Sequence, residues 1–391
     1  MTSIRESIRR LFKPISPLPA GLYPYQAPPE APLPFRLHLR LEADGSGTLI
    51  VNAATILHLN QTAAEYAYFL IKGYSEDGIA EQISNRYRVS IAQAQEDCHD
   101  FIGRLHTLVD TPDLDPESFL DFDRSQPYTS ISAPYRLDCA LTYQLPPGTD
   151  PTFAPTKRVA RELTLAEWQD VLDKAWKAGV PQVVFTGGEP TLRADLPQLI
   201  THAEANGQIS GLLTDGIRFA EAAYLEQILQ TGLDHLLLVL DSRQEAAWKA
   251  LENLVPADIF LTVHLTVTPE NAGAASEIIA RLAKLGVKNI SLSATTADLQ
   301  GKLSQLRDYS AELGLALVWD LPVPYSIHNP VALETLEDRL SPGAGRAWLY
   351  VEPDGDVLPS QGAAQMIGNI LTDEWETIWQ SAIKQPDTLA S

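Results

Sequence analysis

The first hundred residues change from alternating to helical periodicity. Residues 36–42 (RLHLRLE) and 48–52 (TLIVN) flank a turn containing Gly45 and Gly47, which predicts a β-hairpin. A third short strand is predicted at residues 55–60. Apolar residues then recur every three or four positions, which predicts three helices at residues 60–73, 75–87 and 90–108. This part is therefore predicted to be a small α+β domain of three strands followed by three helices.

From residue 137 onward, short apolar runs alternate with amphipathic segments. Continuous apolarity is typical of strands that are buried on both faces of a parallel sheet. The first helix between them begins at a capping box formed by Thr164 and Glu167. Glycines follow the helical segments at steps of 28, 25, 54 and 28 residues, which indicates about six βα units. The predicted strands are 137–144, 182–187, 209–216, 235–242, 259–268, 287–293 and 315–320.

Repeated βα units predict a parallel sheet with right-handed crossovers. The uninterrupted series favours a partial (βα)6 TIM-like barrel, and a flat, doubly wound sheet is the alternative. After Pro322 the periodicity ends, and residues 345–362 predict a hairpin that turns at Asp354 and Gly355. The expected division is a basic arm and proline-rich linker (1–34), the α+β domain (35–108), an acidic linker (109–136), the barrel (137–322) and a small extension (323–391).

Charge and composition narrow the possible partners. The 391 residues carry a formal charge of −21, and so acidic a surface repels nucleic acid. No apolar stretch is long enough to span a membrane, and residues 1–19 lack the apolar core of a signal peptide, so a cytoplasmic location is expected. The basic, amphipathic start of the chain is either a frayed arm or a surface that docks on an anionic bilayer or a partner. Asp113, Asp115 and Glu117 suggest calcium, but the EF-hand spacing is missing and a solvated linker is favoured.

The sequence FTGGEPTLRADL supplies the most specific candidate site. Ligands of parallel α/β domains bind at the carboxyl ends of the strands. There, Gly187 and Gly188 would let a ligand approach the backbone, Glu189 would accept hydrogen bonds from an ammonium group, and Pro190 follows. A glycine turn with a capping glutamate is the alternative. Other residues at strand ends are Tyr143, Gln144, Thr214, Asp215, Asp241, Ser242, Thr266, Thr268, Ser293 and Asp320.

Asp215 and Asp241 are candidate acid or base catalysts, with helix capping as the alternative for both. The eight histidines are scattered without the spacing of a metal site, and most are expected to be structural. The chain has no nucleophile elbow and no P-loop, so these two classes of chemistry lack support.

FTGGEPTLR resembles the GGEP motif of radical S-adenosylmethionine (radical SAM) enzymes, which contacts the amino group of S-adenosylmethionine (SAM). The resemblance covers about residues 137–320 and implies binding of SAM by the GGEP residues, Asp241 and Ser242. The tail is similar to the SPASM extension of peptide-modifying members. The first hundred residues, most clearly LHLNQTAAEYAYFL, resemble the RiPP recognition element, a winged-helix-like module that binds the leader of a precursor peptide.

The chain departs from this family at the first strand. The family holds a [4Fe–4S] cluster with three cysteines, and Leu145, Thr149 and Thr152 stand at those positions here. Leucine has no donor atom, and a neutral hydroxyl is a far weaker ligand than a thiolate. Cys98 and Cys139 are the only cysteines, so three thiolates cannot come from one chain. This predicts that the chain has no cluster and no metal site.

The hypothesis from the sequence is a degenerate, non-catalytic radical SAM-like protein. It would be a recognition or accessory subunit in peptide maturation, which binds a leader or substrate peptide and pairs with an active radical SAM enzyme. The first alternative is an enzyme that binds SAM or a similar amino-bearing ligand in the barrel mouth and acts without a cluster. The second is an active radical SAM enzyme with unforeseen cluster ligands.

Overall fold

The computed structural model describes residues 15–28, 35–52, 55–110, 131–318, 321–336 and 343–384. It divides the chain into two compact units, residues 1–132 and 133–391. The basic, amphipathic start of the chain, the acidic run at 113–117 and Asp320 lie outside the described residues. The finer division into five segments stays a prediction.

The first unit contains an antiparallel sheet in the order β1 (Gly21–Gln26), β2 (Arg36–Leu41), β3 (Gly47–Val51) and β4 (Thr55–Leu59). The predicted hairpin is confirmed, with Leu41 opposite Gly47. Strand β1 differs from the prediction, which placed a linker here. It pairs with β2, and its Tyr23 packs edge-on against Tyr68 with ring centroids 4.9 Å apart. The aromatic contact therefore stabilises β1 as a strand, although this segment contains a proline.

The three predicted helices of this unit are confirmed as α2 (Gln61–Ile71), α3 (Glu76–Arg86) and α4 (Ile91–Asp110). Each of them begins at a polar cap: Asn60 accepts a hydrogen bond from the Ala63 amide, Ser75 accepts one from the Gly78 amide, and Ser90 accepts one from the Gln93 amide. The apolar faces of strands and helices meet in one core. Its fully buried members include Leu37, Leu39, Leu49, Leu57, Ile79, Ile83 and Cys98.

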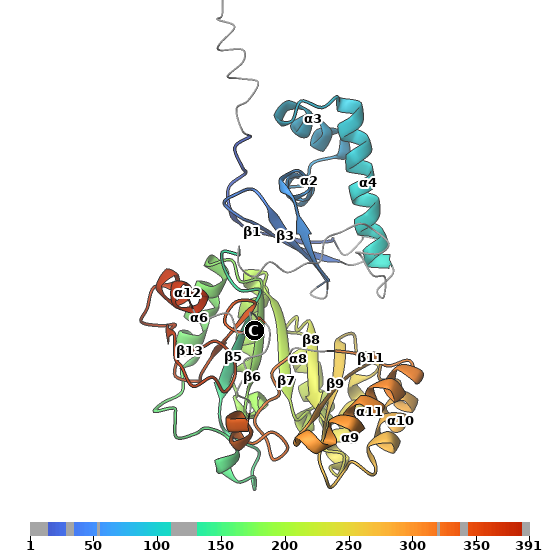
Figure 1. The fold of residues 1–391 in the computed structure, drawn as a ribbon, viewed down its shortest axis with the longest axis vertical. Helices are drawn as coiled ribbons and strands as arrows, with labels where there is room; N and C mark the ends of the chain where they lie inside the picture. Colours follow the sequence, from blue (N-terminus) through green and yellow to red (C-terminus); the bar gives the residue numbers. More distant parts are fainter. Residues whose placement is uncertain are drawn as a thin grey trace, which may run out of the picture. The chain divides into compact units, whose positions relative to one another are not determined.

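The second unit is built on a ten-stranded mixed sheet (Figure 1). Its parallel strands lie side by side in chain order, which a doubly wound sheet would not show. They are β5 (Arg136–Thr142), β6 (Gln182–Gly187), β7 (Ile209–Thr214), β8 (His235–Val239), β9 (Phe260–Val267), β10 (Asn289–Ala294) and β11 (Ala316–Leu317). The connecting helices are α6 (Leu165–Lys177), α7 (Leu196–Asn206), α8 (Ala222–Leu229), α9 (Glu245–Leu254), α10 (Ala275–Leu285) and α11 (Gln300–Glu312).

The C-terminal residues extend this sheet beyond β5. Strand β12 (Trp348–Val351) pairs in parallel with β5, and β13 (Asp356–Leu358) and β14 (Gly368–Asn369) follow antiparallel. The predicted hairpin turn is confirmed, with Gly355 at a φ of 93°. Helix α12 (Trp375–Ile383) completes the unit. The extension therefore shares the sheet of the βα units.

The two faces of the parallel sheet are covered differently. Because the strand order runs in one direction and crossovers are right-handed, the connecting helices lie on one face, the helix face. On the opposite face, Leu321 and Val323 pack against Val184, Leu213, Leu237 and Val239. We call residues 321–336 the connector and this side of the sheet the connector face.

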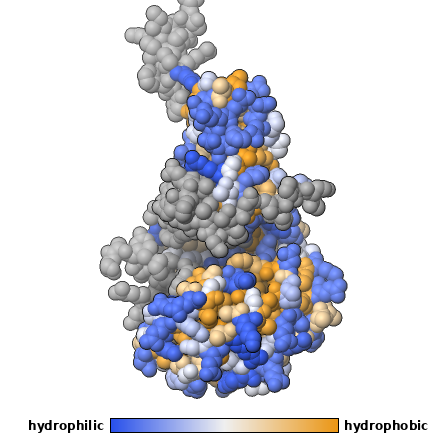
Figure 2. Space-filling view, turned by 90° about the vertical axis from the view of Figure 1, so that its right-hand side faces the viewer, coloured by the Kyte–Doolittle hydropathy of each residue, from blue (hydrophilic) through white to orange (hydrophobic). Residues whose placement is uncertain are grey.

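On the surface, hydrophilic residues surround patches of apolar ones, as Figure 2 shows for the side of the second unit that carries α9 to α11. A cavity of about 310 Å³ lies here and is lined by residues of α9 and α10: Trp248, Glu252, Arg281, Lys284 and Leu285. The Arg281 guanidinium stacks 3.6 Å from the centre of the Trp248 ring, so this one of the two cations that line the cavity has an aromatic partner. Among the described residues, no helix is long and apolar enough to cross a membrane.

Candidate functional site

Two glycines, Gly187 at the end of β6 and Gly188 directly after it, allow the following loop to lie against the end of β5. The Gly188 amide donates to the Thr142 carbonyl, and the Glu189 amide donates to the Gln144 carbonyl, both at 2.8 Å. A Cβ on Gly187 would lie 2.2 Å from the Thr142 oxygen, and one on Gly188 would lie 2.3 Å from the Gln144 oxygen. Glycine is therefore required here by the neighbouring backbone. A role of these glycines toward a ligand stays a prediction.

This loop brings the Glu189 carboxylate into the protein beneath the end of β7. Glu189 is 3% exposed. Its Oε1 accepts hydrogen bonds from the Thr191 amide (2.9 Å), the Thr191 hydroxyl (2.5 Å) and the Thr214 hydroxyl (2.8 Å). Its Oε2 accepts from the Asp215 amide at 2.7 Å. The capping alternative from the sequence is thus present, because Glu189 caps the short 3-10 helix Pro190–Leu192.

The electrostatics around Glu189 favour a cation. No Lys or Arg of the described chain forms an ion pair with it, and its four contacts come from neutral donors. Burial, and secondarily the Asp215 carboxylate, raise the pKa of Glu189 to about 8. Burial also raises the pKa of Asp215. Two adjacent carboxyl groups therefore lack a counter-charge, and a positively charged ligand would stabilise the ionised form of both.

Arg218, which contacts the loop after Glu189, is engaged with other groups. Arg218 donates a hydrogen bond to the Thr191 carbonyl, and its guanidinium lies 3.8 Å from the centre of the Tyr224 ring. The buried hydroxyl of Tyr224 forms no described hydrogen bond. The Tyr224 hydroxyl is thus a polar atom near the two carboxyl groups whose hydrogen-bonding capacity is unused in the described part of the chain.

Asp241, the third predicted carboxylate, belongs to a separate ion pair. Arg243 donates to both of its oxygens, at 2.9 and 3.0 Å, and His328 of the connector lies 3.9 Å away. Burial opposes ionisation, but the hydrogen bonds from Arg243 outweigh it and hold the pKa of Asp241 below its usual value. The neighbouring Ser242 offers its carbonyl to the Trp248 indole. The structure thus brings Glu189 and Asp215 together and gives Asp241 its own counter-charge.

A network that the sequence did not predict anchors the loop after β5. The Tyr143 hydroxyl donates to Glu352 at 2.8 Å, and the Tyr143 ring packs edge-on against Tyr325 of the connector. Arg158 of the loop donates to Glu334 of the connector at 2.8 Å. Burial raises the pKa of both tyrosines, so their hydroxyls stay protonated. The partners are up to 209 residues apart in the chain, and no local sequence signal could have joined them.

The three residues at the positions of the family's iron–sulfur cysteines make local contacts within the protein. Leu145 is partly buried against an apolar group that includes Tyr143, Tyr325 and Tyr350. The Thr149 amide donates to the Pro146 carbonyl, and the Thr152 hydroxyl donates to Asp150 at 2.7 Å. Cys98 and Cys139 are fully buried and lie in different units. The described residues therefore do not fit a site of three thiolates, and we derive no catalytic step through a cluster.

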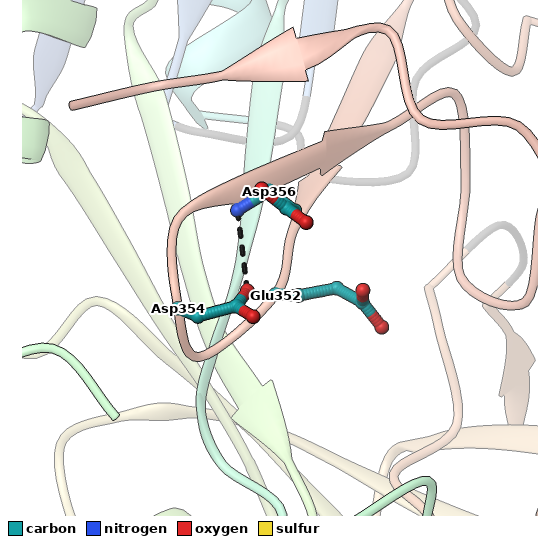
Figure 3. A group of neighbouring side chains, drawn as sticks. All are labelled: Glu352, Asp354 and Asp356. Atoms are coloured by element: carbon teal, nitrogen blue, oxygen red, sulfur yellow. Dashed lines mark hydrogen bonds between the residues drawn. The ribbon is translucent and has the colours of Figure 1, made fainter. Parts of the chain in front are cut away.

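Three carboxylates of the C-terminal hairpin come within 4.8 Å of one another: Glu352, Asp354 and Asp356 (Figure 3). Each already has a partner in the protein. Glu352 accepts from Tyr143 and lies 3.8 Å from Arg158, Asp354 accepts from the Asp356 amide, and Asp356 accepts from Asn369. These contacts account for the proximity of the three carboxylates without a metal ion.

Three comparisons with known proteins each found matches to this chain. The model of the radical SAM superfamily matches residues 139–265. The PqqA peptide cyclase of Streptomyces rochei is 28% identical over 285 residues, which cover 65% of this chain and 77% of that protein. The PqqA peptide cyclase of Gluconobacter oxydans (strain 621H) is 30% identical over 266 residues, which cover 62% and 74%.

Among solved structures, SuiB of Streptococcus suis bound to its precursor peptide SuiA matches with a TM-score of 0.56 and 15% identity, and the match covers 87% of this chain and 86% of that one. SuiB bound to S-adenosylmethionine matches equally, with 91% and 88% covered. At this identity, the likeness concerns the fold: an α/β fold of the radical SAM type.

The comparisons contradict two expectations from the sequence. The relatives have the name of an enzyme, so the interpretation as a non-catalytic accessory subunit, or pseudoenzyme, is wrong, and the alternative of an enzyme fits better. The expected absence of a [4Fe–4S] cluster is contradicted as well, because the match is to a superfamily whose members use one together with SAM. Both expectations relied on the absence of cysteines at Leu145, Thr149 and Thr152 and on the presence of only two cysteines in the chain.

Proposed function

Because the chain belongs to the radical SAM superfamily, we propose that it is a peptide-modifying enzyme that binds SAM, or a ligand with the same amino group, at Glu189 and Asp215. One observation carries this proposal: two adjacent carboxyl groups, one of them 3% exposed, have no counter-charge in the described chain. An ammonium group supplies that charge and donates hydrogen bonds to both.

The protein residues have definite roles in this proposal. Thr191 and Thr214 hold the Glu189 carboxylate in place, and Gly187 and Gly188 fix its loop against β5. At neutral pH, a Glu189 carboxyl with a pKa of about 8 is mostly protonated, so an arriving ammonium group ionises it and a proton leaves. SAM, when bound, would supply the bond between its sulfonium sulfur and a carbon atom, which members of the superfamily cleave.

The test is calorimetric titration of the whole protein with SAM at pH 6.5, in two buffers with different ionisation enthalpies. We expect binding that releases about one proton, because the free carboxyl is protonated and the bound one is not. Glu189→Gln should abolish binding, since an amide offers no charge. Asp173→Asn is the matched control: this carboxylate already has His202 and Asn206 as partners, and its loss should leave the affinity unchanged.

If the wild type and Glu189→Gln bind SAM equally well, or if the wild type does not bind it, the proposed site is wrong. Binding without proton release would also contradict it, because Glu189 would then be ionised before the ligand arrives.

For the first unit, we propose a RiPP recognition element with a winged-helix-like fold that binds a precursor peptide. Three observations support it. The relatives are named for a peptide substrate, and SuiB was solved with its precursor peptide. In addition, β4 pairs only with β3 within the described residues, so its outer edge offers unpaired backbone groups to an extended peptide.

Hydrogen exchange of the whole protein, with and without the precursor peptide encoded beside its gene, tests this proposal. We expect slower exchange of the amides in residues 55–59 and unchanged exchange in β1, which pairs with β2 through its inner edge. Protection confined to other segments would show that the peptide binds elsewhere.

The remaining predictions belong to the same proposal. The βα units at residues 137–322 would form a partial (βα)6 barrel, which the sequential order of the parallel strands supports. Residues 323–391 would form a SPASM-like extension, supported by the pairing of β12 with β5. A cytoplasmic location and a second radical SAM enzyme as partner also stay predictions.

A further inference from the structure

Strands β9 and β10 carry polar side chains on the connector face, although both strands are internal to the sheet. His264 of β9 lies opposite Ser291 of β10, and Thr266 lies opposite Ser293. On the helix face, the same two strands carry only aliphatic residues. These aliphatic residues are Leu261, Val263, Leu265, Val267, Ile290 and Leu292.

His264 is the centre of this polar group. It is 1% exposed, and its ring nitrogens reach three hydroxyl groups. Nδ1 lies 3.0 Å from the Ser291 oxygen, and Nε2 lies 3.0 Å from the Ser293 oxygen and 3.2 Å from the Thr266 oxygen. We call these four residues the hydroxyl–imidazole cluster.

The packing of the sheet alone does not account for this cluster. On β6 to β8, the connector face carries an aliphatic group, Val184, Leu213, Leu237 and Val239, which Leu321 and Val323 cover. The hydrogen bonds within the cluster offset the cost of removing its polar groups from water, but aliphatic side chains would fill the same space without that cost. Ser291 and Ser293 are half-buried, which leaves the serine side of the cluster accessible.

The chemistry of the cluster selects an uncharged ligand. Each hydroxyl can donate one hydrogen bond and accept two, and the contacts with His264 use only part of this capacity. No described acidic or basic side chain other than the imidazole belongs to the cluster, and burial lowers the pKa of His264 to about 4, so the ring is neutral near pH 7. A peptide amide, which donates and accepts side by side, matches these neutral donors and acceptors.

We propose that the hydroxyl–imidazole cluster is a substrate subsite that holds an uncharged amide group of the peptide. This inference rests on the proposed function, because it gives the peptide a place on the sheet whose strand ends carry Glu189 and Asp215. It assigns the cluster to substrate positioning, separate from the two carboxyl groups that would hold the amino-bearing ligand.

The test uses the whole protein, labelled with ¹⁵N in its histidines and free of SAM. The His264 ring signals are assigned by their loss in His264→Asn, and N-acetylglycinamide is titrated as the probe. We expect a saturable shift of these signals with N-acetylglycinamide and none with acetate or methylammonium. In Ser291→Ala/Ser293→Ala the affinity should fall at least about ten-fold, because two hydrogen bonds are lost.

Thr262→Val is the matched control. Thr262 is 2% exposed and lies on the same face of β9, but it has no described hydrogen bond to His264. The Thr262→Val variant should bind N-acetylglycinamide with the affinity of the wild type. The subsite is refuted if no saturable shift occurs, if the charged probes act equally, or if the double alanine variant binds normally. Because SAM is absent, the result is independent of whether Glu189 binds the amino-bearing ligand.

Discussion

Glu189 and His264 are both buried ionisable residues of the second unit, and burial acts on them in opposite directions. A buried carboxyl group resists losing its proton, whereas a buried imidazole resists gaining one. The pKa of Glu189 is therefore raised to about 8 and that of His264 lowered to about 4. Near neutral pH both side chains are largely uncharged, which suits a charged ligand that ionises Glu189 and an uncharged ligand beside His264.

The raised pKa of Glu189 predicts a pH dependence of stability. Between about pH 5 and 8, the folded protein keeps the Glu189 proton while the unfolded chain has lost it. The free energy of unfolding should therefore fall as the pH rises through this window. Glu189→Gln removes the titration, so its urea denaturation should show a weaker fall than the wild type. Parallel curves for the two proteins would contradict the raised pKa.

Gly188 gives a second test at the scale of one residue. In Gly188→Ala the new Cβ would lie 2.3 Å from the Gln144 carbonyl oxygen, so the loop after β6 has to move. We expect a loss of about 2 kcal/mol in the free energy of unfolding, the usual size of an overpacking defect. Gly273→Ala, where a Cβ would meet nothing within 4 Å, is the control and should unfold like the wild type.

At the scale of elements, helix α6 shows how a local signal fixes a structural boundary. The Thr164 hydroxyl accepts a hydrogen bond from the Glu167 amide, while the Glu167 carboxylate accepts one from the Thr164 amide. Thr164→Ala removes half of this capping box and should lower the free energy of unfolding by about 1 kcal/mol, as measured by urea denaturation. Thr156→Ala, at an exposed position of the preceding loop, should change it by less than about 0.5 kcal/mol.

Elements with local signals could be predicted from the sequence. The hairpin of β2 and β3 has glycines at its turn, and α2 has Asn60 at its start. Strand β1 could not be predicted in the same way, because Pro24 weakens the strand pattern and the pairing partner lies beyond a proline-rich stretch. Its formation depends on aromatic contacts with α2 that the sequence does not reveal.

The candidate site divides in the same way. Glu189 and Asp215 follow adjacent strands, so their proximity follows from a parallel sheet and could be predicted. The contact of Tyr143 with Glu352 depends on the pairing of β5 with β12, which no local pattern specifies. The scattered histidines predict a structural role for His264, but Thr262, His264 and Thr266 alternate with aliphatic residues and form a polar face of β9. That alternation was the available signal.

At the scale of the whole molecule, two compact units predict two steps of unfolding. Each unit has its own sheet and its own core, and such units generally unfold separately. Scanning calorimetry of the complete chain should resolve two transitions. Gly188→Ala should shift only the transition of the second unit, since its clash lies there. A single transition that shifts as a whole would show that the units unfold together.

Strand β1 also bears on self-association. Sheets grow into fibres when each copy can add a neighbour on both sides. In the described part of the first unit, β1 forms one border of the sheet, and Pro24 has no N–H to offer an incoming copy. The border at β4 is the more receptive one. Two molecules could therefore pair through their β4 strands. Because the β1 edges of such a dimer do not accept another strand, it would not grow into a polymer.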